Sequence, residues 1–355
     1  MSRVTLKMIA EKSGVSIGTV DRAINNRGRI NASTKQEIID IANSLGYQPN
    51  HLASALSRRQ HLRIAVIMPR FPHYFMDELL AGAESIKNEL ADYNVELEYI
   101  FSNTLSSIEQ EALLCDLDLN RYNAIAINAG SDSLIPYINR FIENEIPVVT
   151  FNSDVPKSMR LFYVGEDSYS SGRVAGELLG KILNGNGNVV LLVGFNNISS
   201  HHERAKGFQD YLRSYYPNIN IINVYEYHDK EEEAFQIMQQ LLDSDINISG
   251  VFCVSAVGVV GVGNCLVNNK KPNEVHVIGY DINYQSAQLL QAGYCDALLY
   301  QDPRKQSRRA LLSLFNLLTG KWESTESCYF TKTKIVLKSN LNDYIEDIYE
   351  KKICD

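Results

Sequence analysis

Apolar positions follow two rhythms along the chain, and the change between them falls near residue 61. Before that point, apolar residues recur every three or four positions in short stretches, which is typical of helices that share a small core. From residue 62 onward, short runs of Val, Ile and Leu alternate with longer stretches of helical period. The pattern therefore predicts a small all-helical head followed by a large body of alternating strands and helices.

The head begins with segment 6–25, LKMIAEKSGVSIGTVDRAIN, which predicts two short helices joined by a tight turn. Gly14 stands where the chain must turn sharply, and we expect a positive φ there. Ser16 is placed to cap the second helix through its hydroxyl. The apolar positions that the two helices would share are Leu6, Ile9, Ala10, Val15, Ile17, Val20, Ala23 and Ile24. This is the helix-turn-helix pattern, whose second helix lies in the major groove of DNA, and a small helical bundle that binds nothing is the alternative.

A third helix is predicted over 34–45, with Ser33 or Asn31 as its cap. Its expected buried face consists of Ile38, Ile39, Ile41, Ala42 and Leu45. Beyond Pro49, the segment HLASALSRR over 51–59 is amphipathic but too short to be a stable helix alone. We expect it to fold on binding, and an ordinary linker is the alternative.

The body contains nine apolar runs that predict strands, at 63–69, 95–101, 124–128, 147–151, 188–194, 219–227, 250–255, 275–280 and 296–301. Stretches of helical period lie between most of them, at 75–92, 106–118, 133–144, 169–183, 202–214, 230–243, 257–268, 283–292 and 303–319. Near-continuous Val and Ile runs suit parallel strands that are buried on both faces.

Two doubly wound α/β lobes explain this alternation better than a single β/α barrel, which is the alternative fold. The number of predicted strands exceeds eight, and segment 161–165, LFYVG, suggests a short crossover between lobes. Ligands of open α/β sheets bind at the carboxyl ends of the strands, so two facing lobes would form a cleft there and close over a ligand.

Charge is distributed unevenly between the two parts. The 355 residues suit two or three domains and carry a formal net charge of −8. Residues 1–60 contain nine Lys and Arg against four acidic residues, so the head carries +5 and the remainder −13. A basic head on an acidic body is expected where only the head meets phosphate.

Several other classes of protein are disfavoured by the sequence. No run of about eighteen apolar residues occurs and no apolar segment follows the N-terminus, so we expect a soluble cytoplasmic protein without a membrane partner. The six cysteines are scattered, which indicates free thiols. His201 and His202 would point about 100° apart on a helix, so we expect no metal site. No catalytic constellation is present, and we expect neither an enzyme nor a cofactor.

The head resembles, position by position, that of the lactose-repressor family, through VTLKMIAEKSGVSIGTV and GYQPNHLASALSRR. The resemblance implies that the second helix reads the major groove, whereas two hinge helices of a dimer enter the minor groove. Leu56 matches the leucine that wedges open the central base step. The residues that match the family's DNA-contacting positions are Thr5, Ser16, Ile17, Gly18, Thr19, Arg22, Asn25, Arg29, Ala53 and Leu56.

Two head residues limit what the resemblance implies about the DNA sequence. Asp21 stands where the family usually has serine, and it would either pair with an arginine or accept from a cytosine amino group. Gly18 matches a base-reading position but has no side chain to contact a base, so it does not indicate the half-site.

The body resembles the periplasmic type I sugar-binding proteins that supply the effector domain of lactose-repressor relatives. The resemblance rests on PVVTFNSD, YVGEDSYSSGRVAGELL, HHERAKGF, VIGYDI and DALLYQDP. It implies three crossings between lobes, near 162–166, 285–296 and 322–330. The implied domains are a head at 1–49, a hinge at 50–61, a first lobe at 62–163 and 294–323, a second lobe at 164–293 and 324–337, and a tail at 338–355.

The same resemblance implies a set of ligand contacts at strand ends: Tyr74, Phe75, Asn152, Ser153, Asp154, His202, Arg204, Ser255, Tyr280, Asp281 and Gln301. His202 replaces an arginine of ribose binders and Ser255 a common asparagine, so the ligand need not be ribose. Fewer cations also argue against a phosphorylated sugar. Arg204 leaves that question open, because it could be a ligand contact or a buried partner of Glu203 or Glu166.

The sequence therefore predicts a DNA-binding transcriptional repressor controlled allosterically by a small sugar or polyol between two lobes. It would bind a pseudo-palindromic operator of double-stranded DNA as a homodimer that could pair into a tetramer. Two alternatives are a sugar-binding sensor that does not act on DNA and a sugar-active enzyme. The basic head disfavours the first, and the missing catalytic constellation disfavours the second.

Overall fold

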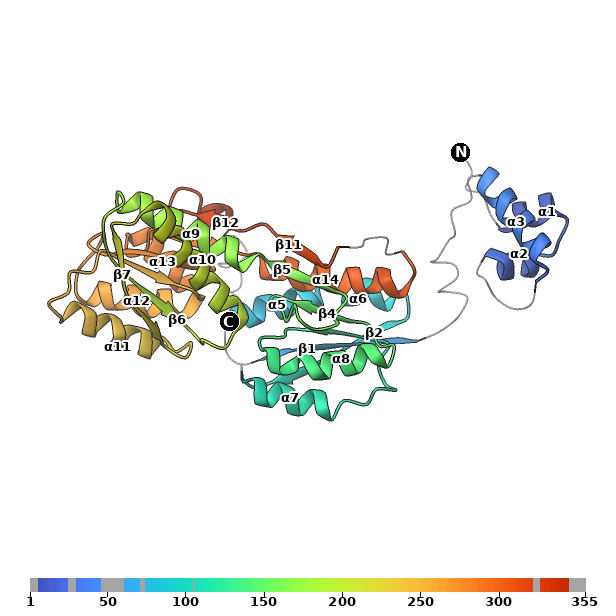
Figure 1. Cartoon of the computed structure of the whole chain (residues 1–355), viewed down its shortest axis with the longest axis horizontal. Helices are drawn as coiled ribbons and strands as arrows, with labels where there is room; N and C mark the ends of the chain where they lie inside the picture. Colours follow the sequence, from blue (N-terminus) through green and yellow to red (C-terminus); the bar gives the residue numbers. More distant parts are fainter. Residues whose placement is uncertain are drawn as a thin grey trace. The chain divides into compact units, whose positions relative to one another are not determined.

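A computed structural model describes residues 6–24, 30–45, 61–70, 74–104, 106–321 and 326–344 of the chain (Figure 1). The chain divides into a unit that contains residues 1–60 and a unit that contains residues 61–318. In the part of the chain that is described, no helix is both long and apolar enough to cross a membrane.

The described residues of the head form three short helices, α1 (Leu6–Ser13), α2 (Ile17–Ile24) and α3 (Ala32–Ser44). Their shared core is formed by Ile9, Ala10, Val20, Ala23, Ile38 and Ala42. Gly14 has a φ of 68°, and the Thr19 N–H donates to Ser16 Oγ at 3.2 Å. Asn31 caps α3 by accepting the Ser33 N–H at 3.1 Å. The predicted turn and both caps are therefore confirmed.

The body contains two six-stranded sheets, each with helices on both faces (Figure 1). The first has the order β11-β5-β4-β3-β1-β2 and is parallel throughout. Its strands are β1 (Leu62–Pro69), β2 (Val95–Ser102), β3 (Ala124–Ile127), β4 (Val148–Phe151), β5 (Phe162–Glu166) and β11 (Cys328–Thr331). Its helices are α5 (Tyr74–Glu84), α6 (Lys87–Ala91), α7 (Ser107–Cys115), the 3-10 turn η1 (Asp132–Leu134), α8 (Ile135–Glu143) and α14 (Pro303–Leu318).

The second sheet has the order β12-β10-β9-β8-β6-β7, in which only β12 is antiparallel to its neighbour. Its strands are β6 (Gly187–Val193), β7 (Ile219–Glu226), β8 (Gly250–Cys253), β9 (His276–Tyr280), β10 (Ala297–Tyr300) and β12 (Lys334–Val336). Its helices are α9 (Ser168–Ile182), α10 (Ser199–Tyr215), α11 (Glu231–Leu242), α12 (Ala256–Asn268) and α13 (Tyr284–Ala292). Two separate sheets exclude the barrel and confirm the predicted two-lobed fold.

Burial on both faces of each sheet explains the apolar runs. In β1, Ile64 and Val66 pack in one core cluster, whereas Ala65 and Ile67 pack in another on the opposite face. Strand β6 divides in the same way between the two clusters of the second lobe. Successive side chains of a strand point to opposite faces, so a doubly covered strand needs apolar residues at every position.

The chain passes between the sheets after β5, after β10 and between β11 and β12. Segment 161–165 was expected to be a crossover, but β5 pairs with β4 and β11, so the passage follows it. The second crossing, expected near 285–296, lies at 301–302 because β10 pairs with β9 of the second sheet. The third lies at 332–333, after β11, rather than within 322–330.

The described start of the predicted tail packs on the second lobe. Leu341 is buried in the core of that lobe, and the Tyr344 ring lies 5.7 Å from the Tyr300 ring between centroids. Residues 345–355 lie outside the described residues, as does the predicted hinge segment 50–60.

Helices α9 and α10 cross closely at two glycines. A Cβ on Gly172 would lie 2.1 Å from the Arg204 carbonyl oxygen, which belongs to backbone that cannot yield easily. We therefore expect Gly172→Ala to lower the free energy of unfolding by about 2 kcal/mol, measured by urea denaturation. Gly176→Ala, one turn further along α9, is the comparison, because its Cβ would meet Phe208 O at 3.0 Å. An equal loss in both variants would contradict the close crossing at Gly172.

Candidate functional site

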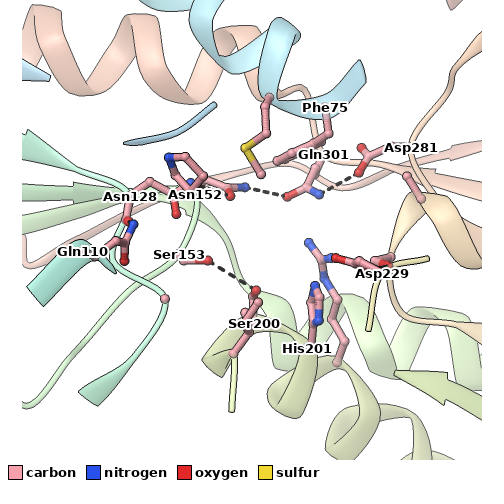
Figure 2. Close-up of a pocket in the computed structure, with 17 residues that line it drawn as sticks. Phe75, Gln110, Asn128, Asn152, Ser153, Ser200, His201, Asp229, Asp281 and Gln301 are labelled. Carbon is pink, nitrogen blue, oxygen red and sulfur yellow. Dashed lines mark hydrogen bonds between the residues drawn. The ribbon is translucent and has the colours of Figure 1, made fainter. Parts of the chain in front are cut away.

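A cavity lies between the two lobes, at the carboxyl ends of strands from both sheets (Figure 2). The cavity has a volume of about 60 Å³ in the observed arrangement of the lobes, and about 620 Å³ when the adjoining space that is open to solvent is counted. The first lobe contributes Phe75, Met76, Gln110, Asn128, Asn152 and Ser153 to its wall, among others. The second lobe contributes Ser200, His201, Arg204, Asp229, Ser255 and Asp281, and Gln301 follows the last strand before the second crossing.

A chain of hydrogen bonds joins carboxamides and a carboxylate across the cavity (Figure 2). Asn128 Nδ2 donates to Asn152 Oδ1 at 3.0 Å, and Asn152 Nδ2 donates to Gln301 Oε1 at 3.3 Å. Gln301 Nε2 in turn donates to Asp281 Oδ2 at 2.9 Å. Asn152 and Asp281 directly follow β4 and β9 with φ values of 62° and 56°, a left-handed conformation that Asn and Asp adopt more readily than most residues.

Among the described residues of this wall, Asp281 has a buried side-chain atom that lacks a hydrogen bond. Its side chain is only 3% exposed, and its Oδ1 atom is buried without a hydrogen-bond partner in the protein. Burial raises the pKa of this carboxyl to about 7, against the opposing effect of Arg204. A buried acceptor without a donor is costly, so Oδ1 is suited to accept a hydrogen bond from a ligand in the cavity.

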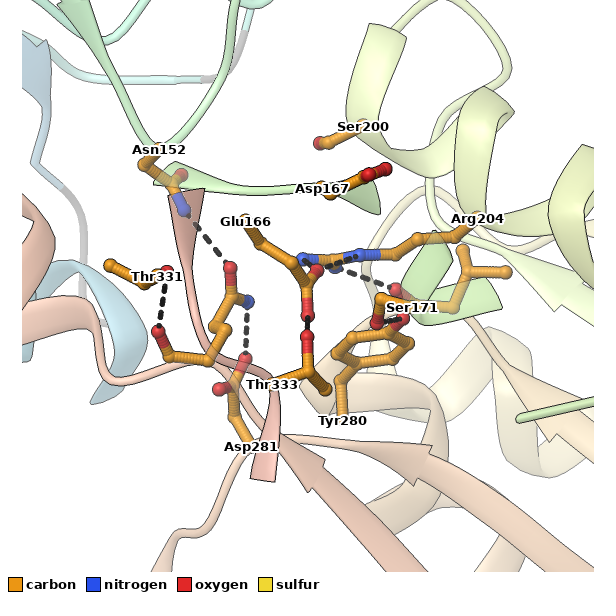
Figure 3. Close-up of polar contacts among 12 residues, drawn as sticks. Asn152, Glu166, Asp167, Ser171, Ser200, Arg204, Tyr280, Asp281, Thr331 and Thr333 are labelled. Carbon is orange, nitrogen blue, oxygen red and sulfur yellow. Dashed lines mark hydrogen bonds and ion pairs between the residues drawn. The ribbon is translucent and has the colours of Figure 1, made fainter. Parts of the chain in front are cut away.

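Arg204 forms a buried ion pair with Glu166 (Figure 3). Its Nε and Nη2 atoms donate to Glu166 Oε2 at 3.0 and 2.8 Å, and its Nη1 atom donates to the Val254 carbonyl oxygen at 3.0 Å. Among the two partners that the sequence left open, the structure pairs Arg204 with Glu166. The guanidinium nevertheless lines the cavity, so both structural and ligand roles remain compatible with its position.

Tyr280 supports this arginine instead of lining the cavity. Its ring lies beneath the guanidinium, 3.8 Å from Arg204 Cζ to the ring centroid. Its hydroxyl is hydrogen-bonded to Ser171, and burial raises the pKa of this phenol well above its usual value. Tyr280 therefore contacts Arg204 in the described structure, and its direct contact with a ligand stays a prediction.

Three further predicted ligand residues do not line the cavity. Tyr74 is half-buried outside it, although its neighbour Phe75 lines the wall. The Asp154 carboxylate turns away to pair with Arg160 and accepts the Thr150 hydroxyl at 2.6 Å. The cavity wall therefore retains Phe75, Asn152, Ser153, Arg204, Ser255, Asp281 and Gln301 from the predicted set.

His202 is the third predicted ligand residue that does not line the cavity, and its neighbour His201 lines the cavity wall instead. His202 is exposed and lines a neighbouring surface hollow, whereas His201 lines the cavity. His201 Nδ1 accepts the Phe195 N–H at 3.2 Å. Within the described residues, no group of three or more His, Cys, Asp and Glu side chains could hold a metal ion.

Sequence reasoning missed several residues of the wall. Asn128 directly follows β3, and Asp229 follows β7 closely, so the rule that ligands meet strand ends could have found both. Asp229 Oδ1 accepts the Ser255 hydroxyl at 2.6 Å. Gln110 lies within α7 and donates to the Asn128 carbonyl oxygen at 3.1 Å, and no sequence signal marked it.

Helix α2 of the head presents an outward face that suits a DNA surface. Ile17 is 49% exposed although it is apolar, and Arg22 is exposed as well. Arg22 Nη2 donates to Thr19 Oγ1 at 3.3 Å, and Thr19 Oγ1 lies 2.9 Å from Ser16 Oγ. The predicted contacts Thr5, Asn25, Arg29, Ala53 and Leu56 lie outside the described residues, as does the side chain of Asp21.

Comparisons with known proteins identify both parts of the chain. Residues 64–321 match the periplasmic binding protein domain, and residues 5–50 match the bacterial regulatory proteins of the lacI family. The transcriptional regulator RegA of Clostridium saccharobutylicum is 26% identical over 80% of this chain and 84% of its own length. The probable transcriptional repressor ExuR of Bacillus subtilis is 27% identical over 78% and 81%.

Solved structures share the fold of the body. A glucose-galactose binding protein of Geobacillus stearothermophilus, GanP, shares the fold of the body with a TM-score of 0.73 at 24% identity. The alignment covers 79% of this chain and 99% of that protein. The chain therefore belongs to the lacI family of bacterial regulatory proteins, and its body is a periplasmic binding protein domain.

Proposed function

We propose that this chain is a transcriptional repressor that binds operator DNA through its head and is controlled by a small sugar or polyol in the cavity. The observation that carries the ligand assignment is the buried Asp281 Oδ1 atom, which has no donor within the protein. The exposed face of α2 and the lacI-family match of residues 5–50 support the DNA assignment. The proposed place of action is the cytoplasm, and the proposed activity is regulatory, not enzymatic.

The wall of the cavity has the chemistry that a polyhydroxylated ligand requires. Asp281 can accept from a hydroxyl, and the amides of Asn128 and Gln110 can both donate and accept. Phe75 offers an apolar surface from the first lobe. Because these groups come from both lobes, one small ligand would contact both and change how firmly they are held together.

Contacts between the segments that cross from lobe to lobe could couple ligand binding in the cavity to DNA binding by the head. Glu166, at the first crossing, accepts the Thr333 hydroxyl at 2.7 Å, and Thr333 lies at the third crossing. Asn152 also donates to Gln306 of α14 at 3.1 Å. We infer that a ligand shifts one lobe against the other about these segments. In a homodimer, this shift would change the separation of the two Leu62 positions where β1 begins, and so the spacing of the heads on a pseudo-palindromic operator.

Operator binding tests this proposal directly. A labelled fragment from upstream of the protein's own gene should form a discrete complex, and one sugar of a panel should change its midpoint by at least tenfold. The hinge helix at 51–59 and the wedge formed by its Leu56 belong to the same proposal. A complex that forms with all DNA equally, or one that no sugar changes, would contradict it.

Ligand affinity should depend on pH in a defined direction. Burial raises the pKa of Asp281 to about 7, and a ligand hydroxyl that donates to Oδ1 would favour the ionised form. Binding should therefore release a proton, and affinity should rise between about pH 6 and pH 8 and then level off. Isothermal titration calorimetry at several pH values across this range measures the affinity for the ligand.

A histidine variant distinguishes Asp281 from another titratable group of this wall. His201 lines the same cavity, so His201→Gln should retain the pH dependence if Asp281 is its source. An affinity that is constant over this range, or that falls as pH rises, would contradict the proposed contact with the ionised carboxylate.

A further inference from the structure

The cavity contains one strong cation, and its charge is already paired. Arg204 is the only Lys or Arg among the described residues of the wall. Two of its nitrogen atoms donate to a single oxygen of Glu166, which is 2% exposed. A buried, hydrogen-bonded ion pair of this kind leaves little net positive charge for a ligand.

Two carboxylates of the second lobe face the same cavity without an arginine or lysine partner in the described structure. Asp281 accepts from Gln301, and Asp229 accepts from the Ser255 hydroxyl, both of which are neutral donors. Together with the Glu166–Arg204 pair, they give the wall a net negative charge when ionised. Like charges in a poorly hydrated site repel strongly, so an acidic ligand would be disfavoured.

The remaining positive groups do not reverse this balance. His201 Nδ1 accepts a backbone N–H, so this atom carries no proton in the observed arrangement. Helices α10 and α12 begin at the cavity, and each helix N-terminus is equivalent to about half a positive charge. Some of these N–H groups are already engaged, because the Ser199 N–H donates to Gly130 O at 3.2 Å and the Gly258 N–H donates to Tyr227 Oη at 3.0 Å.

We propose that the cavity selects an uncharged sugar or polyol and rejects sugars that carry a phosphate or carboxylate, and that Glu166 sets this selectivity by neutralising Arg204. The inference rests on the proposed function, whose ligand class it narrows. Arg204 has five N–H groups, and its contacts with Glu166 and Val254 engage three of them. The other two can donate to neutral hydroxyl oxygens, whereas a bound anion would have to compete with Glu166 (Figure 3).

Matched ligand series test this inference on the full-length protein by isothermal titration calorimetry. Each series keeps one carbon skeleton: glucose with glucose 6-phosphate and glucuronate, galactose with galactose 6-phosphate and galacturonate, and ribose with ribose 5-phosphate and ribonate. In the series that binds, the acidic members should bind at least about 100-fold more weakly than the neutral sugar. An acidic member that binds as tightly as its neutral parent would overturn the inference and leave the proposed function standing. Binding by no member of any series would overturn the proposed function as well.

The Glu166→Gln variant tests the assigned cause. It leaves the Arg204 charge unpaired, so the ratio of acidic to neutral affinity should rise by at least tenfold. The ratio is the readout because a general loss of affinity cancels from it. Glu203→Gln is the matched control, since it makes the same charge change at the residue before Arg204 and leaves the Glu166–Arg204 pair in place.

A second variant keeps the test decisive if Glu166→Gln folds poorly. Asp229→Asn removes a carboxylate from the wall without touching the Arg204 pair, and it should raise the same ratio. Ratios that stay at the wild-type value in every variant that folds would overturn the assignment of selectivity to these charges.

Discussion

Replacing Asp281 with Ala is expected to abolish the response to the effector while leaving operator binding intact. The carboxylate is buried in the cavity wall, and its Oδ1 atom lacks a donor until a ligand supplies one. Hydrogen bonds to charged groups contribute roughly 1.5–3 kcal/mol each, so the loss of the one to Oδ1 should weaken ligand binding by about 10- to 150-fold. Fluorescence anisotropy of labelled operator, titrated with effector, measures both properties in one experiment.

Asp154→Ala is the matched control for this variant. Sequence comparison placed Asp154 in the ligand site, but its carboxylate pairs with Arg160 and accepts from Thr150. Its loss should therefore lower stability and leave the effector midpoint within about threefold of the wild-type value. A normal effector response in Asp281→Ala would show that the ligand binds elsewhere.

Deleting residues 1–60 is expected to remove all measurable DNA affinity and to retain ligand binding. These residues carry a net charge of +5, whereas the remainder carries −13 and should repel phosphate. Every described residue of the cavity wall belongs to the other compact unit, which begins at residue 61. Anisotropy on operator DNA and calorimetry with the effector test the two halves of this prediction.

The point variant Arg22→Ala tests DNA binding by the head without deleting it. Arg22 is exposed on α2, so its replacement should weaken operator binding without changing the fold of the body. A truncated protein that still binds the operator would contradict the assignment of DNA binding to the head. A truncated protein that is folded but no longer binds the effector would contradict the independence of the cavity.

The regular parts of the fold could be predicted because their pattern is local. Each of the nine apolar runs overlaps a strand, and in inner strands such as β3 and β8 burial on both sheet faces imposes an uninterrupted apolar sequence. Strand β5 was predicted to be a crossover, and the short strands β11 and β12 were missed, because three to five residues of mixed polarity show no period. The second crossing was misplaced for the same reason: nothing local distinguishes a strand of one sheet from a strand of the other.

The candidate site was predictable where it depends on strand ends and unpredictable where it depends on helix phase. Asn152, Asp281 and Gln301 follow strands and do line the cavity. His201 and His202 are adjacent on α10, so a rotation of about 100° decides which one faces inward. The pairing of Arg204 with Glu166 joins residues 38 positions apart, and only the packed lobes bring them together.

The central claim is that one small ligand in the cavity controls binding of the head to DNA. The most direct test is the affinity of the wild-type protein for DNA from upstream of its own gene, measured across a salt series with and without each neutral sugar. We predict a discrete complex that weakens steeply with salt and whose midpoint one sugar changes by at least tenfold, with no change in Asp281→Ala. A specific complex that responds to no sugar, or one that responds equally in wild type and Asp281→Ala, would contradict the claim.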